Sequence, residues 1–177
     1  MTVKNENSGP AFSIPEFLNV QLYHVDETRE YFSVIEGQLR GTKASVKLDN
    51  DGSSFLITRS EHTKPVNLTY STRKKTLKIG SSVFITKDYP SMPWKKGLYD
   101  IEIPDAPHRG GQSYPEAKYA VTWFRVGHDG ERYIHTGRNS LGCITVTERE
   151  RWDELYNVLI RARSGDKVSV GILEVTD

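Results

Sequence analysis

The chain has 177 residues, of which 36% are hydrophobic, and its basic and acidic side chains leave a formal net charge of +1. This length suits one domain with its own core. The near-neutral charge gives no overall electrostatic basis for binding nucleic acid or an anionic membrane surface. The single cysteine excludes a disulfide within the chain, and no apolar run approaches the length that spans a membrane.

The amino-terminal stretch is polar and lacks the apolar core of a secretory signal. Residues 1–12 are enriched in Asn, Ser, Gly and Pro, a composition typical of a flexible segment. We therefore expect a flexible leader over 1–12 and a single domain over 13–177. Because no signal peptide is visible, the protein is expected to be made in the cytoplasm.

Alternation of apolar and polar residues predicts strands along most of the chain. Two hairpins are expected where turn sequences lie between alternating segments. They are residues 44–48 with 54–58 around Asn50-Asp51-Gly52, and residues 118–126 with 131–135 around Asp129-Gly130. Further strands are predicted over residues 77–79, 83–86, 97–103 and 168–175.

One helix is predicted near the carboxyl end. Thr147 and Glu150 have the spacing of a capping box, and Ser164-Gly165 is expected to end the helix. An apolar stripe at helical spacing follows the cap, formed by Trp152, Leu155, Tyr156 and Leu159. The predicted fold class is therefore mainly β with one C-terminal helix.

The most informative segment holds the only cysteine, Cys143, eight residues after His135. A thiol is a strong nucleophile only as the thiolate, so it needs a base or a cation nearby. His135 at the end of a predicted strand meets that need if Cys143, on the following loop, faces the same groove. The segment predicts a cysteine acyl-transfer site. Either the imidazole accepts the thiol proton, or the pair rests as thiolate and imidazolium.

Two other interpretations of Cys143 stay open. The thiol can be a small buried core group beside Ile144 and Val146. It can also join His128 and His135 as a metal ligand, although the paired spacing of structural zinc sites is absent. The loop-like residues 139–142 before the cysteine favour the catalytic interpretation. We therefore predict no metal and no other cofactor.

The segment around the cysteine resembles a known family signature. His135, followed by Ser140-Leu141-Gly142-Cys143-Ile144, resembles the motif of the L,D-transpeptidase (YkuD-type) family of peptidoglycan enzymes. The sequence Lys-Gly-Leu-Tyr-Asp-Ile at residues 96–101 resembles a strand of that family. The short spacing between histidine and cysteine is most similar to variants among type VI secretion effectors that target peptidoglycan. Two positions depart from the family motif. Leu141 replaces a histidine that is common there, and Thr145 replaces a frequent arginine.

The resemblance implies a β-sandwich-like catalytic domain in which Cys143 is the nucleophile and His135 the base. Backbone N–H groups near Leu141, Gly142 and Cys143 are then expected to stabilise the oxyanion. Ser140 is expected to shape this loop or to hydrogen-bond near the thiolate.

The resemblance also implies a substrate, the stem tetrapeptide of peptidoglycan. Attack at the diaminopimelate carbonyl releases terminal D-alanine, after which an amine acceptor gives transpeptidation and water gives carboxypeptidase activity. His108 and Tyr114 in the predicted loop 104–116, together with Arg138, are candidate substrate contacts.

The group that orients His135 is not identified by the sequence. A histidine base normally has its second ring nitrogen held by a hydrogen bond. In the family a backbone carbonyl often does this, and Asp100, Asp105 and Asp129 are alternatives.

The resemblance further implies dedicated delivery to the periplasm or cell wall, and an immunity protein as a partner of an antibacterial effector. Neither nucleic acid nor membrane insertion is expected. Two other functions remain under consideration. One is a different cell-wall cysteine amidase or endopeptidase, and the other is a non-catalytic β-sandwich binding module in which Cys143 is structural.

Overall fold

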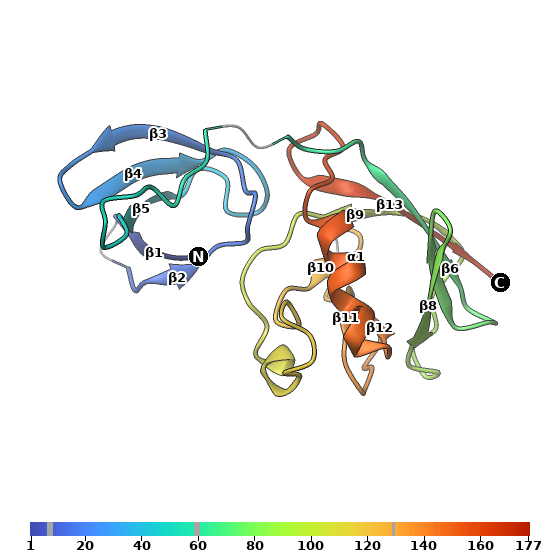
Figure 1. The fold of residues 1–177 in the computed structure, drawn as a ribbon. Helices are drawn as coiled ribbons and strands as arrows, with labels where there is room; N and C mark the ends of the chain where they lie inside the picture. The colour runs from blue at the N-terminus through green and yellow to red at the C-terminus, as the bar shows by residue number, and fades with distance from the viewer. Residues whose placement is uncertain (7–8, 59–60, 129) are drawn as a thin grey trace.

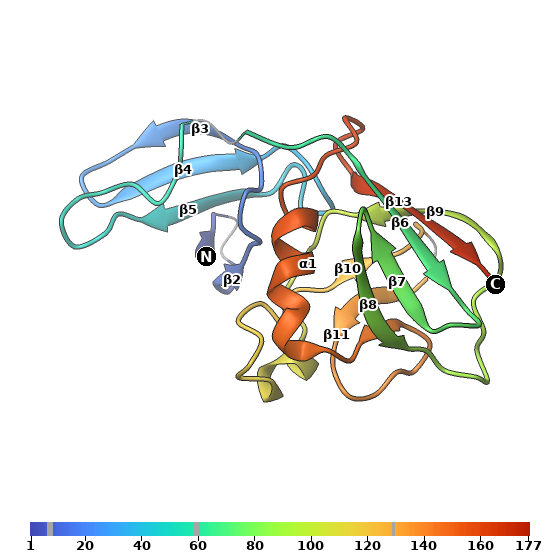
Figure 2. The same ribbon diagram turned by 45° about the vertical axis from the view of Figure 1, so that its right-hand side comes forward.

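The computed structural model describes residues 1–177 except 7–8, 59–60 and 129. It is mainly β-structure with one short α-helix near the carboxyl end, which confirms the expected fold class. Two sheets form two lobes that lie side by side (Figures 1 and 2). The small lobe contains β1–β5, and the large lobe contains β6–β13 and α1. Within the described residues, no helix has the length and apolarity needed to cross a membrane.

The small lobe is a five-stranded sheet with strand order β2-β1-β5-β4-β3. Its strands are β1 (Thr2–Asn5), β2 (Phe12–Ser13), β3 (Val20–Val25), β4 (Arg29–Val34) and β5 (Lys43–Lys47). Alternate side chains point to one face of the sheet. They form an apolar cluster separate from that of the large lobe, including Val3, Phe32 and Val46.

Residues 1–12 differ from the expected flexible leader because they contain β1. This strand pairs with β2 on one side and with β5 on the other. Val3, opposite Phe12, is only 1% exposed, and burial of this apolar side chain holds the polar segment on the sheet. Within this segment, Thr2–Asn5 is thus held by strand pairing. That residues 13–177 act as a single catalytic domain stays a prediction.

The first predicted hairpin is half correct. β5 forms and is followed by a turn in which Asp49 N–H donates to the carbonyl of Ser53. Residues 54–58, however, form no strand. The physical reason is that β4 and β1 already pair with the two edges of β5, so no edge remains for a hairpin partner.

The large lobe is an eight-stranded sheet with strand order β10-β11-β12-β8-β7-β6-β13-β9. Its strands are β6 (Val66–Ser71), β7 (Thr76–Ile79), β8 (Ser82–Lys87), β9 (Gly97–Glu102), β10 (Phe124–Arg125), β11 (Tyr133–Thr136), β12 (Ile144–Val146) and β13 (Ser169–Thr176). An isolated bridge between Ile101 and Val126 brings the two ends of this order together. The sheet thereby curls around an apolar core that also contains the buried side of α1.

The strands predicted over 77–79, 83–86, 97–103 and 168–175 are confirmed as β7, β8, β9 and β13. The second hairpin is also present, since Phe124 of β10 pairs antiparallel with Ile134 of β11. Its first strand is much shorter than expected, because residues 118–121 form turns. Asp129, predicted for the hairpin turn, lies outside the described residues.

The helix α1 (Trp152–Leu159) forms, and its predicted apolar stripe is buried. The capping box is wrong. Thr147 Oγ1 donates to the Ile85 carbonyl, and Glu148 accepts from the Ile85 N–H, so these residues attach to β8. A 3-10 turn, η2 (Arg149–Arg151), then leads into the helix without a side-chain cap.

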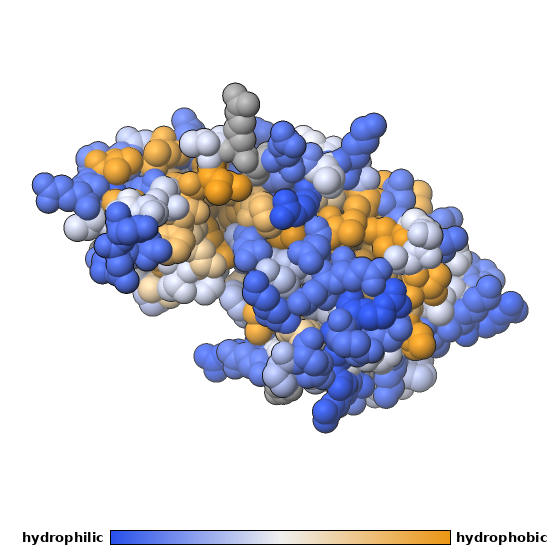
Figure 3. Space-filling model, in the orientation of Figure 1, coloured by the Kyte–Doolittle hydropathy of each residue, from blue (hydrophilic) through white to orange (hydrophobic). Residues whose placement is uncertain are grey.

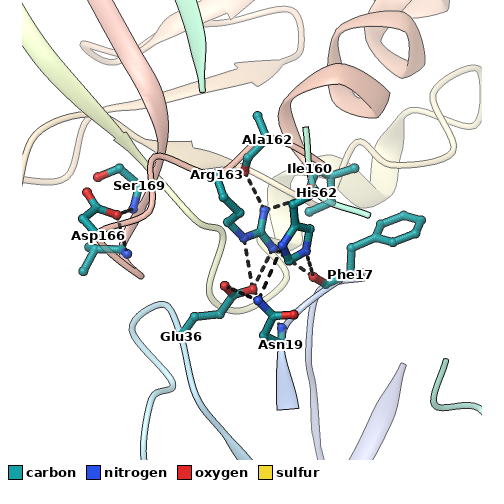
Figure 4. A network of polar contacts seen from close by, with 10 residues as sticks. Phe17, Asn19, Glu36, His62, Ile160, Ala162, Arg163, Asp166 and Ser169 are labelled. Carbon is teal, nitrogen blue, oxygen red and sulfur yellow. Dashed lines mark hydrogen bonds and ion pairs between the residues drawn. The ribbon is translucent and has the colours of Figure 1, made fainter. Parts of the chain in front are cut away.

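A buried ion pair joins the two lobes, as Figure 4 shows. The Arg163 guanidinium of the large lobe contacts Glu36 of the small lobe at 2.8 Å, and both side chains are at least nine-tenths buried. Arg163 also donates to the carbonyls of Phe17, Ile160 and Ala162. Asn19 donates to Glu36 through its backbone and its side chain. Every charge of the pair is therefore hydrogen-bonded, as burial requires.

Apolar side chains reach the surface on both lobes, whereas the lower part of the large lobe in Figure 3 is hydrophilic. On the small lobe the exposed apolar side chains include Leu22, Val25, Phe55 and Ile57. On the large sheet they include Val83, Ile85, Leu98 and Ile172.

Candidate active site

Two neighbouring parallel strands, β11 and β12, position the predicted nucleophile and base. His135 lies on β11, and Cys143 immediately precedes β12. The strands pair in a register that places His135 opposite Thr145. Side chains alternate across a strand. Cys143 and Thr145 are two residues apart, so their side chains point to the same face. The short loop between the strands therefore brings sulfur and imidazole to one end of the sheet.

Cys143 and His135 line the same groove, whose volume is about 510 Å³. The sequence predicted a shared groove for these two residues, and their roles as nucleophile and base stay a prediction. The other lining residues are His108, Trp123, Glu131, Tyr133, Asn139 and Leu141.

His135 is 5% exposed, and both of its ring nitrogens have neighbours. Nδ1 lies 2.8 Å from the carbonyl oxygen of Thr136, and Nε2 lies 3.1 Å from Thr145 Oγ1. A carbonyl only accepts hydrogen bonds, so Nδ1 carries the proton and Nε2 has the free lone pair. Burial, with a smaller contribution from the charge of His108, lowers the pKa of His135 to about 4, and the Thr136 carbonyl opposes this shift only in part.

Cys143 is 9% exposed and is held against β11. Burial raises the pKa of the Cys143 thiol. The Tyr133 backbone N–H, which donates to the sulfur, and the nearby Arg132 charge oppose this shift without cancelling it. At neutral pH the sulfur is therefore protonated and the imidazole is uncharged. This environment favours the first of the two predicted resting states, a neutral thiol beside a neutral base.

Among the described residues, no hydrogen bond joins His135 to Cys143. Thr145 engages Nε2 of His135 instead. Thr145 Oγ1 also lies 3.2 Å from the carbonyl oxygen of Asn139. Its single hydrogen can donate to that carbonyl or to Nε2, but not to both at once. Nε2 is therefore one hydroxyl rotation away from being an unoccupied proton acceptor.

Ser140 shapes the loop before the cysteine. Its Oγ donates to the Cys143 carbonyl at 2.7 Å and accepts from the Gly142 N–H at 3.3 Å. Gly142 has a φ of +117°, a conformation that disfavours larger residues. The Gly142 N–H is thus committed to Ser140. The N–H groups of Leu141 and Cys143 stay predicted oxyanion donors.

The three predicted substrate contacts separate in space. His108 lines the groove, whereas Tyr114 and Arg138 do not. The Tyr114 hydroxyl accepts from the Arg138 backbone N–H, and its ring packs against Gly137. Tyr114 therefore supports the loop between His135 and Cys143 without lining the groove. The Arg138 residue is exposed at that loop.

Sequence reasoning missed the aromatic wall of the groove. The Trp123 indole stacks on the His135 ring, with centroids 4.1 Å apart, and also on the His108 ring, at 4.3 Å. Tyr133 contacts both Trp123 and His108 edge to face. The observed register of β10 and β11, extended by one residue beyond Phe124 and Ile134, places Trp123 opposite His135.

The alternative roles of the predicted acidic residues and metal ligands are not supported. Asp100 and Glu102 contact His128, and Asp105 faces His108, so none of these carboxylates orients His135. Asp129 lies outside the described residues. The backbone carbonyl of Thr136, not a carboxylate, lies within hydrogen-bond distance of His135 Nδ1. Among the described residues, no group of three or more His, Cys, Asp or Glu side chains is arranged to hold a metal ion.

Comparisons with known proteins give distant structural likenesses only. No family model matches the chain, and no curated protein gives a significant match. An L,D-transpeptidase from Mycobacterium tuberculosis H37Rv is 13% identical with a TM-score of 0.45, covering 90% of this chain and 77% of that chain. L,D-transpeptidase 1 of Mycobacterium tuberculosis is 13% identical with a TM-score of 0.43, covering 94% and 85%. An L,D-transpeptidase from Mycobacterium smegmatis is 13% identical with a TM-score of 0.40, covering 89% and 77%. Values this low assign neither a family nor a reaction to this chain.

Proposed function

We propose that this protein is a cysteine-dependent acyl transferase of peptidoglycan stem peptides, acting as an L,D-transpeptidase or L,D-carboxypeptidase. The observation that carries the proposal is the shared groove of Cys143 and His135, built from adjacent strands. The motif from His135 to Ile144, with its resemblance to this enzyme family, supplies the substrate class.

The first half-reaction begins with the neutral pair. Thr145 turns its hydroxyl to the Asn139 carbonyl, and His135 Nε2 accepts the thiol proton as the sulfur attacks the amide carbonyl. An S–C bond forms while the carbonyl electrons move onto oxygen. On collapse the C–N bond to the terminal amino acid breaks, and His135 returns the proton to the leaving amine. The products are a thioester on Cys143 and a free amino acid.

The second half-reaction regenerates the enzyme. An amine or a water molecule attacks the thioester, losing a proton to His135, and the S–C bond breaks. The sulfur then regains that proton. An amine acceptor gives transpeptidation or amino-acid exchange, and water gives carboxypeptidase activity.

The backbone near the nucleophile supports oxyanion binding. Ser140 fixes the turn that carries the Leu141 and Cys143 N–H groups. One donor aimed at the oxyanion contributes roughly 3 kcal/mol to lowering the barrier. The aromatic wall of Trp123 and Tyr133 shields the other side of the groove.

The proposal also includes delivery of the protein to the compartment that holds peptidoglycan. Peptidoglycan lies outside the cytoplasm, so action on it requires export to the periplasm or cell wall. A secreted antibacterial effector with a cognate immunity protein is the role that the short-loop motif suggests.

The proposal is tested by incubating purified muropeptides with the wild-type protein, Cys143→Ala and His135→Gln. Mass spectrometry is expected to show loss of terminal alanine, exchange of that alanine, or new crosslinks with the wild type only. Fragments cut at another amide would support the alternative of a cell-wall amidase or endopeptidase. Unchanged muropeptides from several peptidoglycan types would contradict enzymatic action on this polymer and favour a binding module.

A further inference from the structure

An arginine lies beside the nucleophile in the paired strands. Extended by one residue beyond its first pair, the parallel register of β11 and β12 places Tyr133 opposite Cys143. One residue further, Arg132 lies opposite Gly142. The Tyr133 N–H, which donates to the sulfur, belongs to the peptide bond that joins Arg132 to Tyr133. The backbone of Arg132 therefore leads directly into the donor that holds the sulfur.

The Arg132 side chain is fixed by the connection of residues 88–96 between β8 and β9. Its guanidinium donates to the carbonyls of Met92 and Pro93. It also lies over the indole of Trp94, 4.4 Å from the ring centroid. Trp94 is 5% exposed and belongs to the core of the large lobe. Because the ring is anchored in the core, the guanidinium is held in one place.

The same side chain passes close to the residue before the nucleophile. A β-carbon added at Gly142 would lie 3.8 Å from Arg132 Nε and 3.6 Å from the methyl carbon of Met92. Arg132 thus lies between the loop that carries Cys143 and the connection of residues 88–96. Its position is tied to that of the nucleophile.

Arg132 has a positive charge that no described carboxylate balances at ion-pair distance. Three other arginines of the large lobe do pair with carboxylates, namely Arg149, Arg151 and Arg163. The hydrogen bonds from Arg132 go to carbonyls, which leave its net charge in place. Burial raises the pKa of the Cys143 thiol, and the Arg132 charge acts against this shift.

Other ionisable groups surround the thiol on the neighbouring elements. Those on the groove lining are His108, Glu131, Tyr133 and His135. At the end of β8, Asp88 is paired with Lys75, and Lys87 lies opposite Thr145. His135 is uncharged at neutral pH, because its pKa is about 4. Within the described chain, Arg132 supplies the charge that favours the thiolate.

We propose that Arg132 is a positioning residue that holds a positive charge beside the Cys143 sulfur and stabilises its thiolate during the reaction. This inference rests on the proposed function and adds the group that supports the sulfur while it is charged. When an amine or water resolves the thioester, the S–C bond breaks and its electron pair stays on the sulfur. The His135 imidazolium then returns the proton. A neighbouring cation favours the sulfur in this charged form.

The first test uses the thiol alone and needs no peptide turnover. Labelling of Cys143 by iodoacetamide is measured against pH in the wild type, Arg132→Gln and Arg132→Lys. Without the charge, Arg132→Gln is expected to label about threefold or more slowly below the thiol pKa, with the rise in rate moved to higher pH. Lysine keeps the charge but not the planar fork of the guanidinium, and it is expected to recover most of the rate.

The matched control is Lys95→Gln, which removes the same charge from an exposed position in the connection of residues 88–96. Its labelling profile is expected to equal that of the wild type. Thermal unfolding of each variant checks that the fold is kept.

The second test measures release of D-alanine from a stem tetrapeptide. Arg132→Gln is expected to lower kcat by about threefold or more with little change in KM, because the charge acts on the sulfur rather than on the bound peptide. Arg132→Lys is expected to restore most of the wild-type kcat.

Two labelling results would overturn the role of Arg132. One is a rate for Arg132→Gln that equals or exceeds that of the wild type. The other is an equal loss in the Gln and Lys variants, which would show that the side chain acts through packing rather than charge. Absence of Cys143-dependent turnover in the wild type contradicts the proposed function instead, and the labelling rates then still decide whether Arg132 stabilises the thiolate.

Discussion

His135 lies directly opposite Thr145 in the pairing of β11 with β12, and the Thr145 hydroxyl is 3.1 Å from Nε2. Cys143 lies two residues before Thr145, where its sulfur accepts from the Tyr133 backbone N–H. The hydroxyl of Thr145 thus holds the ring nitrogen that must receive the thiol proton. Thr145 is fully buried, so water does not replace it.

Replacing Thr145 by Val removes this hydroxyl while keeping the shape of the side chain. We expect kcat to fall by up to about tenfold, the worth of one net hydrogen bond, with little change in KM. The pKa of His135 is expected to stay low, because burial of the ring is the main cause of its shift and valine keeps the ring buried. Steady-state kinetics and NMR titration of the ring measure the two quantities.

The control for this substitution is Thr145→Ser, which restores the hydroxyl. Serine is expected to recover most of the wild-type kcat. Equal kinetics in the Val and Ser variants would show that the hydroxyl does not position the ring.

The reactivity of the thiol gives a separate prediction. Because burial raises the pKa of Cys143, iodoacetamide is expected to label the resting protein slowly at neutral pH. The rate is expected to rise only above the ordinary thiol pKa of about 8.5. His135→Gln is expected to leave this profile nearly unchanged, since the resting pair is neutral. A labelling rate that is already maximal at pH 6 would indicate a thiolate–imidazolium pair and contradict this resting state.

The buried imidazole predicts a pH dependence of stability. The pKa of His135 is about 4 in the folded chain and about 6.5 when unfolded. Above pH 6.5 both states are neutral, so His135 has no effect. As the pH falls from 6.5 through 4, only the unfolded state gains a proton, and the free energy of unfolding drops by about 3 kcal/mol. Chemical denaturation at pH 7 and pH 4 measures this difference.

His135→Gln provides the matched comparison, since glutamine does not titrate. Its unfolding free energy is expected to change less between pH 7 and pH 4 than that of the wild type. Parallel curves for the two proteins would mean that the ring is not buried in its neutral form.

The ion pair between the lobes predicts a stability effect far from the groove. Glu36→Gln leaves the Arg163 charge buried without its partner. Loss of one member of a buried pair destabilises by about 3–5 kcal/mol, and thermal unfolding is expected to show it. The double variant Glu36→Met with Arg163→Met removes both charges and is expected to recover much of this loss. A double variant as unstable as Glu36→Gln would show that packing, rather than charge, dominates at this contact.

The sequence predicted the elements whose local pattern agrees with their final environment. β7, β8, β9 and β13 follow simple alternation, and the stripe from Trp152 to Leu159 fits one helical face. The His135–Cys143 groove was predicted because strand, loop and strand lie in one short segment, so nearness in sequence becomes nearness in space.

The failures depend on partners that are distant in sequence. Residues 54–58 alternate like a strand, but both edges of β5 are occupied by other strands. Thr147 fits a helix cap, yet its hydroxyl bonds to Ile85, 62 residues away. Trp123 completes the groove through the observed register of β10 and β11, and the sequence predicted the hairpin without a register. In each case the decisive contact is long-range, and local pattern carries no information about it.

The thioester on Cys143 is the intermediate on which the account depends. Intact-protein mass spectrometry after rapid mixing with stem tetrapeptide, followed by acid quenching, measures it directly. We predict a mass increase equal to the tetrapeptide less D-alanine, mapped to Cys143 and absent from Cys143→Ala. Release of D-alanine at the same rate by the wild type and Cys143→Ala, with no adduct on the protein, would contradict cysteine catalysis.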